Sequence, residues 1–344
     1  MLKALRAHDP QTIELLCGKG SVLIPPSLAG RIFCQLDGEL VHRLDAAALQ
    51  NPSPAQYDNL GGNSLWPAPE GGLFAFNYPP DKDEWMVQDG IAKAVPNVSQ
   101  ETGHRAVVEK RITLTNRKGV RMDLNYRRVV TVAEDMTLAK GYRLDTMGYR
   151  TEDIFEPVGE YRADDVLLAP WSLEQFPGAE GIVTFGRVAE AKDALNIDFY
   201  GDPGERISWH AGHFLFRLGG TARHQIGVKV QSKPQCIGAL DLRRSMLFLR
   251  KTEIQPGVYF NIADNEQING PYSTADLYSI FNGGELGFFE LETIGAMREI
   301  DGCAGVSILP SETLILKGDQ DELLRYLAEQ EALHLNPSDL PAMA

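Results

Sequence analysis

The chain has 344 residues and carries 47 acidic against 33 basic side chains, which gives a formal net charge of −14. This charge opposes binding to nucleic acid and to anionic membrane surfaces, so we expect a small neutral or cationic molecule as the partner. No stretch approaches the ~20 apolar residues of a membrane-spanning helix, and residues 1–10 lack the apolar segment of a signal peptide. The sequence therefore predicts a cytoplasmic protein.

The cysteines lie far apart in the sequence and form no CxxC pair (Cys17, Cys34, Cys236 and Cys303). Neither a zinc ribbon nor a disulfide framework is expected, so the thiols are predicted to be reduced and buried. The sequence also lacks a GxSxG nucleophile elbow and a GxxxxGK[ST] phosphate loop. We predict no metal and no cofactor, and the sequence carries no signal for an oligomeric state.

Short apolar runs between residues 12 and 44 are separated by Gly and Pro, which predicts strands joined by tight turns. Asp37-Gly38 is the strongest hairpin signal among them. Residues 59–72 follow and contain two glycine pairs, two prolines and one tryptophan. Because proline removes a backbone donor and glycine raises the entropy cost of order, we predict a rigid, shaped loop here.

This predicted loop carries Asn63, Trp66 and Glu70. An amide, a stacking face and a carboxylate are together the parts of a polar small-molecule site. A structural corner with Trp66 in the core is the alternative interpretation.

Period-two alternation in residues 104–115 and 120–133 predicts an antiparallel strand pair with one solvated face. Further strand-like runs extend along the chain (165–168, 181–185, 213–218, 225–230, 245–249, 258–262, 287–291 and 313–316). Only residues 319–334 read clearly as a helix, with leucines on one stripe. We therefore predict an all-β fold of large antiparallel sheets with a short C-terminal helix.

A single sandwich domain over residues 1–344 is the simplest expectation, because the sequence shows no repeat, no low-complexity linker and no sharp change of composition. Two stacked β domains that join near residues 201–204 are the alternative.

Glu290 and Glu292 lie two residues apart in a strand-like run, so both carboxyls point to one face while Phe289 and Leu291 fill the other. If this face lines a cleft, one carboxyl could hold a raised pKa and act as a general base. If it faces solvent, the pair is ordinary surface charge.

His210, His213 and His224 lie close in the sequence. The HxxH spacing can in principle ligate zinc, but His210 and His213 are expected on opposite sides of a strand, and the helical HExxH form is absent. A general acid or a hydrogen-bonding wall of a sugar site is the second interpretation, and ordinary packing is the third.

Residues 169–175 give a second segment with a tryptophan beside polar side chains, Trp171 and Gln175 among them. Aromatic faces stack on the C–H face of a pyranose while amides and carboxylates bind its hydroxyls, so this predicted loop could pair with residues 59–72. A core tryptophan with a satisfied indole N–H is the alternative.

Several segments, taken in order, resemble uncharacterised members of the galactose mutarotase (aldose 1-epimerase) superfamily. The most specific is Gly61-Gly-Asn-Ser-Leu-Trp-Pro-Ala-Pro-Glu70, and weaker matches begin at Pro26, Tyr78, Thr102, Trp171 and Phe289. The resemblance covers most of residues 20–316 and implies a β-supersandwich with a sugar-binding cleft.

In that family a glutamate takes the anomeric proton and a histidine protonates the ring oxygen. Glu292 resembles the base in position, whereas the family's mid-chain Asn-His segment is missing and residues 171–175 occupy its place. Asn63 stands where related sequences often carry a charged residue, and Arg31 could substitute for it.

The resemblance therefore implies a protein that binds a small carbohydrate and interconverts its anomers. Glu292 is the expected base and His210 the expected acid. The expected substrate-binding residues come from several parts of the chain (Arg31, Asn63, Trp66, Glu70, Trp171, Gln175 and Glu290), with the two tryptophans as sugar platforms. The alternatives are a non-catalytic sugar-binding or sensing protein, and a structural β-sandwich whose tryptophans are buried and whose glutamates are exposed.

Overall fold

The computed structural model describes residues 2–52, 59–80, 84–132, 139–260, 262 and 275–340. Its strands are, in chain order, β1 (Ile13–Cys17), β2 (Gly20–Ile24), β3 (Phe33–Leu36), β4 (Glu39–Leu40), β5 (Gly62–Ala68), β6 (Asn97–Thr102), β7 (Arg105–Thr115), β8 (Arg121–Val132), β9 (Leu144–Pro157), β10 (Ala169–Pro177), β11 (Val183–Val188), β12 (Leu195–Asn196), β13 (Ile207–His210), β14 (His213–Arg217), β15 (His224–Lys229), β16 (Pro234–Asp241), β17 (Met246–Lys251), β18 (Asp276–Asn282), β19 (Phe288–Ile294), β20 (Glu299–Ile300), β21 (Cys303–Ala304) and β22 (Ser307–Gly318). The α-helices are α1 (Leu2–His8), α2 (Ala46–Gln50), α3 (Asp89–Ala92) and α4 (Gln320–Gln330).

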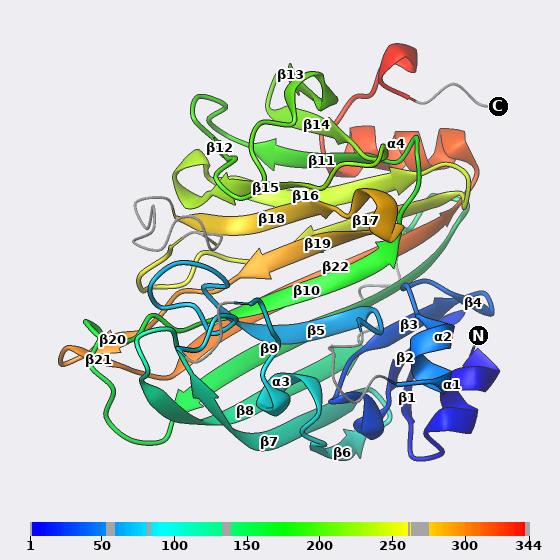
Figure 1. The fold of residues 1–344 in the computed structure, drawn as a ribbon. Helices are drawn as coiled ribbons and strands as arrows, with labels where there is room; N and C mark the ends of the chain where they lie inside the picture. The colour runs from blue at the N-terminus through cyan, green and yellow to red at the C-terminus, as the bar shows by residue number, and fades with distance from the viewer. Residues whose placement is uncertain are drawn as a thin grey trace.

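The strands form two large antiparallel sheets and two small ones. The six-stranded sheet has the order β12-β15-β18-β19-β10-β5, and the ten-stranded sheet has the order β13-β14-β11-β16-β17-β22-β9-β8-β7-β6. Strands β1 to β4 make a four-stranded sheet, and β20 and β21 a two-stranded one. In Figure 1 the strands of the six-stranded sheet follow one another from β12 near the top to β5 below. The predicted all-β architecture is confirmed.

The main core lies between the two large sheets, where phenylalanines from both meet. Phe176 of β10 packs against Phe248 of β17, with 4.4 Å between ring centroids, and against Phe289 of β19 at 5.3 Å. This buried cluster runs through the chain from Leu15 to Ile315. Burial of so many large apolar side chains is the dominant favourable term in forming this sandwich.

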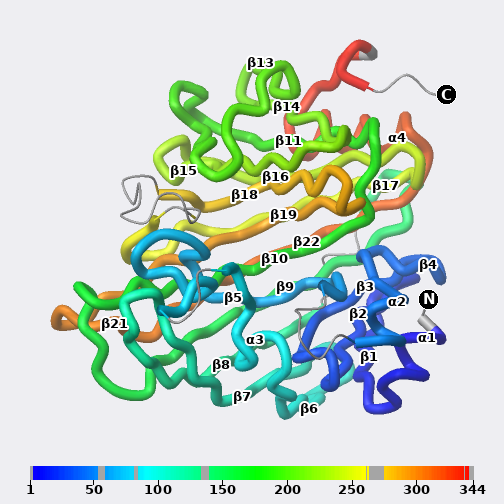
Figure 2. Tube along the Cα trace, in the orientation of Figure 1, coloured from blue at the N-terminus to red at the C-terminus, as the bar shows by residue number. Residues whose placement is uncertain are grey.

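Two smaller elements flank the ten-stranded sheet. The N-terminal sheet β1 to β4 packs beside β7, β8 and β9, as the blue and green tubes in Figure 2 show. Helix α4 places Leu323 and Leu327 against the leucines of β14, β16, β17 and β22. The predicted C-terminal helix is confirmed, although it ends at Gln330 and not at residue 334. No helix among the described residues is long and apolar enough to cross a membrane.

Most of the predicted strands occur in the structure. The alternating runs form β7 and β8, with Lys110 opposite Tyr126, while residue 133 of the second run lies outside the described residues. Two runs do not form strands: residues 165–168 precede β10, and Val258 makes only an isolated bridge to Met297, while residue 261 of that run lies outside the described residues.

Both tryptophan segments were expected to be loops, and this was wrong for their central parts. Residues 62–68 are strand β5, which pairs with residues 169–175 of β10 so that Trp66 lies opposite Trp171. Strand β5 is the last strand of its sheet. Proline is tolerated there because an edge strand keeps its ladder bonds on one side only, which accommodates Pro67.

Candidate functional site

The acid pair of β19 lies in the middle of the six-stranded sheet, between β10 and β18. Phe289 points into the core between the large sheets. Because side chains alternate along a strand, Glu290 and Glu292 point to the opposite face. This side of the six-stranded sheet, turned away from the ten-stranded sheet, is called the outer face below.

The carboxyls of Glu290 and Glu292 interact with each other and are both buried, with Glu292 0% exposed. The amide of Gln175 donates to Glu290 Oε1 at 2.7 Å, and the indole N–H of Trp171 donates to Glu292 Oε2 at 2.9 Å. The amide of Gln225 lies 3.3 and 3.4 Å from the two oxygens of Glu292. Three neutral side chains therefore donate to the pair.

Burial dominates the titration of this acid pair. It raises the pKa of Glu290 to about 7. The pKa of Glu292 is also raised well above its ordinary value, first by burial and then by the neighbouring charge of Glu290. Two carboxyls in contact cannot both be ionised at low cost, so near neutral pH the pair holds one shared proton. Such a pair can both accept a proton and donate one.

Two arginines lie on the β5 side of the acid pair and favour ionised Glu290. Arg31 donates to the carbonyl of Gly61 at 2.8 Å. Arg43 binds Asp45 at 3.0 Å and lies 5.0 Å over the ring of Phe288. The positive charges of these arginines therefore make Glu290 the member of the pair that ionises more readily.

Two exposed aromatic side chains stand near the acid pair. Trp85 is 41% exposed, and its indole N–H donates to Glu70 Oε1 at 2.5 Å. Tyr200 is 42% exposed, and its ring lies 6.0 Å from that of Phe281, the residue opposite Glu290 on β18. Burial, helped by the charge of Glu70, raises the pKa of Tyr200 to about 12. Glu70 therefore lies among the aromatic groups that border the outer face.

Trp66 and Trp171 do not have the exposed faces of sugar platforms. Both are buried, and their rings meet edge to face with 5.8 Å between centroids. Trp171 instead orients Glu292 through its N–H. The ring of Trp66 also packs against that of Trp85, with 6.1 Å between centroids. The accessible aromatic surface comes from Trp85 and Tyr200, which the sequence analysis did not select.

Asn63 faces the wrong side of its sheet for a sugar ligand on the outer face. Its amide oxygen accepts from Arg128 at 2.6 Å and from Ser172 at 3.1 Å, and its amide nitrogen donates to Tyr149 at 2.9 Å. The cause is strand alternation: Asn63 lies opposite Glu174, one residue out of step with the outward pair Ser64 and Leu173. Asn63 therefore belongs to the core between the sheets.

The structure does not bring His210 to Glu292. His210 ends β13, the last strand of the ten-stranded sheet, whereas Glu292 is central in the other sheet. The chain turns sharply after His210, so His213 is its cross-strand partner, and the two rings stack at 4.9 Å. The expectation that these two histidines face opposite sides was wrong because the turn falls between them. His210 also lies 3.7 Å from Asp339.

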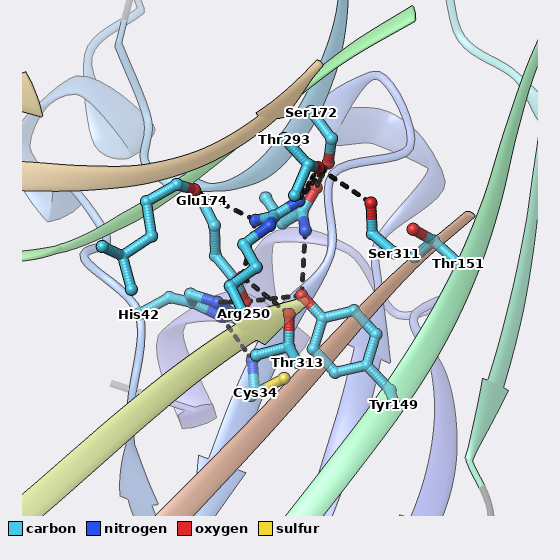
Figure 3. A network of polar contacts seen from close by, with 12 residues as sticks. Cys34, His42, Tyr149, Thr151, Ser172, Glu174, Arg250, Thr293, Ser311 and Thr313 are labelled. Atoms are coloured by element: carbon cyan, nitrogen blue, oxygen red, sulfur yellow. Dashed lines mark hydrogen bonds and ion pairs between the residues drawn. The ribbon is translucent and has the colours of Figure 1, made fainter. Parts of the chain in front are cut away.

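Sequence reasoning missed a buried ionic network below the acid pair, on the inner face of the same strands (Figure 3). Its centre is Glu174 of β10, which accepts from Arg250 at 2.6 Å, Thr313 at 2.8 Å, Tyr149 at 2.6 Å and pairs with His42 at 2.7 Å. Burial alone would raise the pKa of Glu174, but Arg250 and these hydrogen bonds lower it to about 2. Glu174 is therefore a permanent carboxylate.

Arg250 connects this network to the strands that carry the site. Its guanidinium donates to Ser172 of β10 at 2.6 Å, and to Thr293 Oγ1 and the Leu291 carbonyl of β19 at 3.1 and 3.2 Å. The strands that hold Glu292 and its donor Trp171 are thus tied together from the inner side. Such support keeps a site preorganised. Local sequence carried no signal for this network, because the placement of Glu174 opposite Asn63 follows from strand register.

Among the described residues, no group of three or more His, Cys, Asp or Glu side chains is arranged to hold a metal ion.

Comparisons with known proteins agree with this fold. The family model DUF6786, described as a family of unknown function, matches residues 1–330. No curated protein matches the sequence. A candidate aldose 1-epimerase from Escherichia coli K12 aligns with a TM-score of 0.51 at 10% identity, over 89% of this chain and 98% of that one.

Two further solved structures align at lower scores. A galactose mutarotase-like protein from Lactobacillus casei has a TM-score of 0.48 at 10% identity, over 89% of this chain and 99% of that one. A galactose mutarotase related enzyme from Lactobacillus acidophilus has a TM-score of 0.49 at 8% identity, over 90% and 99%. The Escherichia coli structure supports the predicted mutarotase-like sandwich as the fold of this chain.

Proposed function

The chain belongs to the family DUF6786, and from the geometry of its outer face we propose that it binds a small carbohydrate there and interconverts its anomers. The observation that carries the proposal is the acid pair: Glu290 and Glu292 are buried on one face of the sheet, contact neutral donors, and have raised pKa values. Four free cysteines are consistent with the expected reducing, cytoplasmic compartment.

Anomer interconversion needs one proton acceptor and one proton donor on neighbouring oxygens. Glu290, which Arg31 and Arg43 favour in its ionised form, takes the proton of the anomeric hydroxyl. Glu292 holds the proton of the pair and gives it to the ring oxygen. The bond between the anomeric carbon and the ring oxygen breaks, and the anomeric carbon becomes a carbonyl.

Ring closure completes the reaction. Rotation of the open chain presents the other face of the carbonyl, the ring oxygen attacks it and returns its proton to Glu292, and Glu290 returns its own proton to the new hydroxyl. The protons on the pair are then as they were at the start. Glu292 therefore serves as the acid in place of the expected base, and the pair needs no histidine, which fits the position of His210 in the other sheet.

Sugar recognition rests on aromatic faces and amides. Trp85 and Tyr200 present exposed rings for the C–H face of a pyranose. The amides of Gln175 and Gln225 donate to the acid pair. They can also bind the sugar hydroxyls next to the anomeric carbon. Glu70, bonded to Trp85, is the expected acceptor at the rim.

A non-catalytic sugar-binding role is the second candidate, and the complete burial of Glu292 favours it. A catalytic carboxyl must reach the ring oxygen of the sugar, whereas binding without catalysis requires only the accessible side chains at the edge of the site. A purely structural β-sandwich predicts buried tryptophans, which Trp66 and Trp171 are, but it also predicts exposed glutamates, whereas the acid pair is buried.

Polarimetry or NMR saturation transfer on a panel of aldoses tests the proposal. We expect faster anomerisation of at least one sugar, and a loss of about 10²–10⁴-fold in Glu290→Gln and in Glu292→Gln. Binding by calorimetry without any acceleration across the panel supports the second candidate instead.

Asp241→Asn is the matched control, because Asp241 is a buried carboxyl at the end of β16 in the other sheet. It should leave both rate and binding unchanged. Rates that stay at the wild-type value in both glutamate variants exclude the acid pair as the proton relay.

A further inference from the structure

A third buried carboxyl lies on the same outer face, on β18, the strand next to that of the acid pair. Asp276 begins β18 and is 2% exposed. Its Oδ2 accepts from the amide of Asn196 at 2.7 Å, whereas its Oδ1 has no hydrogen-bond partner in the structure. Buried polar atoms are almost always hydrogen-bonded, so an orphaned carboxylate oxygen requires an explanation.

Strand register places Gly227 and Asn196, the two residues that contact the Asp276 carboxyl, in one row with Glu292. Glu292 of β19 lies opposite Ser279 of β18, and Ser279 lies opposite Gly227 of β15, which in turn lies opposite Asn196 of β12. Directly opposed residues in antiparallel strands point to the same face. Gln225, two residues from Gly227, confirms the side, because its amide reaches Ser279 and Glu292.

The missing side chain of Gly227 is what makes room for this carboxyl. A Cβ at Gly227 would lie 2.5 Å from Asp276 Oδ2 and 2.7 Å from its carboxyl carbon. The carboxyl therefore rests directly over Gly227, on the outer face. Any larger residue at this position would displace it.

The spacing between the two acidic positions sets the size of the ligand. Neighbouring strands lie about 4.8 Å apart, so Glu292 and Gly227, two strands apart, are separated by about 10 Å. One pyranose ring spans roughly one strand spacing. A ligand that reaches both positions along this row therefore contains at least two rings.

Resting on the proposed function, we propose that the ligand is a saccharide of two or more rings, with its reducing ring at Glu290 and Glu292 and a second ring held by Asp276 Oδ1 over Gly227. The bond to a ring hydroxyl supplies the partner that this oxygen lacks. Burial, which raises the pKa of Asp276 to about 7, is consistent with a carboxyl that accepts or donates to a neutral hydroxyl. Asp276 is then a specificity residue, because it touches no atom of the reacting ring.

Calorimetric titration with glucose, galactose, cellobiose, lactose and maltose tests this inference. We expect at least one disaccharide to bind tenfold or more tightly than its component monosaccharides. Asp276→Asn should remove most of that difference and leave monosaccharide affinity unchanged. Gly227→Ala, which displaces the carboxyl without removing it, should act in the same way.

Asp241→Asn, a buried carboxyl in the ten-stranded sheet, is the control and should change neither affinity. Equal affinity for mono- and disaccharides, or an undiminished disaccharide preference in Asp276→Asn and Gly227→Ala, overturns the second-ring position while the proposed function stands. Failure of every sugar to bind the wild-type protein overturns the proposed function and this inference together, so the two failures are distinguishable.

Discussion

Glu174 and Glu292 lie on neighbouring strands, one residue out of step in register, and the two carboxyls are buried on opposite faces of one sheet. Glu174 has Arg250 at 2.6 Å, and its pKa falls to about 2. Glu292 has only neutral donors and a second carboxyl, and its pKa rises. The same depth of burial therefore yields a permanent anion below the sheet and a proton carrier above it.

The first prediction concerns stability against pH. Glu290 and Glu292 have raised pKa values when folded, so the native state binds more protons than the unfolded state above about pH 4.5. Stability should then fall as pH rises from about 5 to 8. Glu292→Gln should flatten this slope and raise the free energy of unfolding at pH 8 by about 1–3 kcal/mol.

Urea unfolding at several pH values measures this effect. Glu285→Gln, in an exposed turn, is the control and should keep the wild-type slope. A slope in Glu292→Gln equal to that of the wild type would mean that the pair carries no shared proton.

The second prediction concerns the inner network. Glu174→Gln leaves Arg250 buried without its counter-charge, so we expect a loss of about 3–5 kcal/mol in the free energy of unfolding at pH 7. Because the pKa of Glu174 is lowered in the folded state, this contribution is present above about pH 4.5 and disappears as pH falls toward 2. The gap between variant and wild type should therefore narrow in acid.

Glu312→Gln provides the comparison, since Glu312 pairs with Arg150 at 3.0 Å on the surface of the ten-stranded sheet. Exposed pairs contribute at most about 1 kcal/mol. Similar losses in the two variants would contradict the structural role given to Glu174.

The third prediction concerns the exposed aromatic rim. Trp85→Ala should weaken sugar binding by about 1 kcal/mol, or roughly fivefold in Kd, because stacking on its ring is lost. Trp209 is 45% exposed on β13, in the other sheet, and Trp209→Ala should leave Kd unchanged. Calorimetry on both variants compares one exposed indole with another, and equal effects would argue against stacking at the rim.

The fourth prediction concerns the pH dependence of anomerisation. The reaction needs one ionised and one protonated carboxyl, so the rate should pass through a maximum. The acidic limb should fall where Glu290, with its pKa of about 7, becomes protonated. A rate that is flat from pH 5 to 9 in the wild type would exclude a proton relay by the pair.

The alternating strands and the terminal helix could be predicted from the sequence because their burial is one-sided. Strand β8 alternates between buried and more exposed residues, and alternation of that kind is visible in sequence. Strands β5 and β10 are buried on both faces and carry proline and polar residues, so they looked like loops. Their pairing depends on tertiary context that local patterns do not contain.

Part of the candidate site could also be predicted from the alternation of side chains along a strand. The common face of Glu290 and Glu292 follows from strand alternation alone, and Gln175, which was expected to bind substrate, donates to Glu290. The inward orientation of Asn63 and the remoteness of His210 depend on register and on a turn, which sequence spacing does not determine. Glu174 was overlooked because a buried ion pair joins residues 76 positions apart.

Pro67 of β5 also affects whether this sheet can associate with a strand of another chain. The backbone N–H of Asn63 points away from β10, where it binds the Ile32 carbonyl at 2.8 Å. Backbone donors alternate along a strand, so a donor at Pro67 would point to that same side, and none exists there. A terminal strand with free donors is a template for aggregation. At this position the sheet cannot be extended by hydrogen bonding to a strand from another chain.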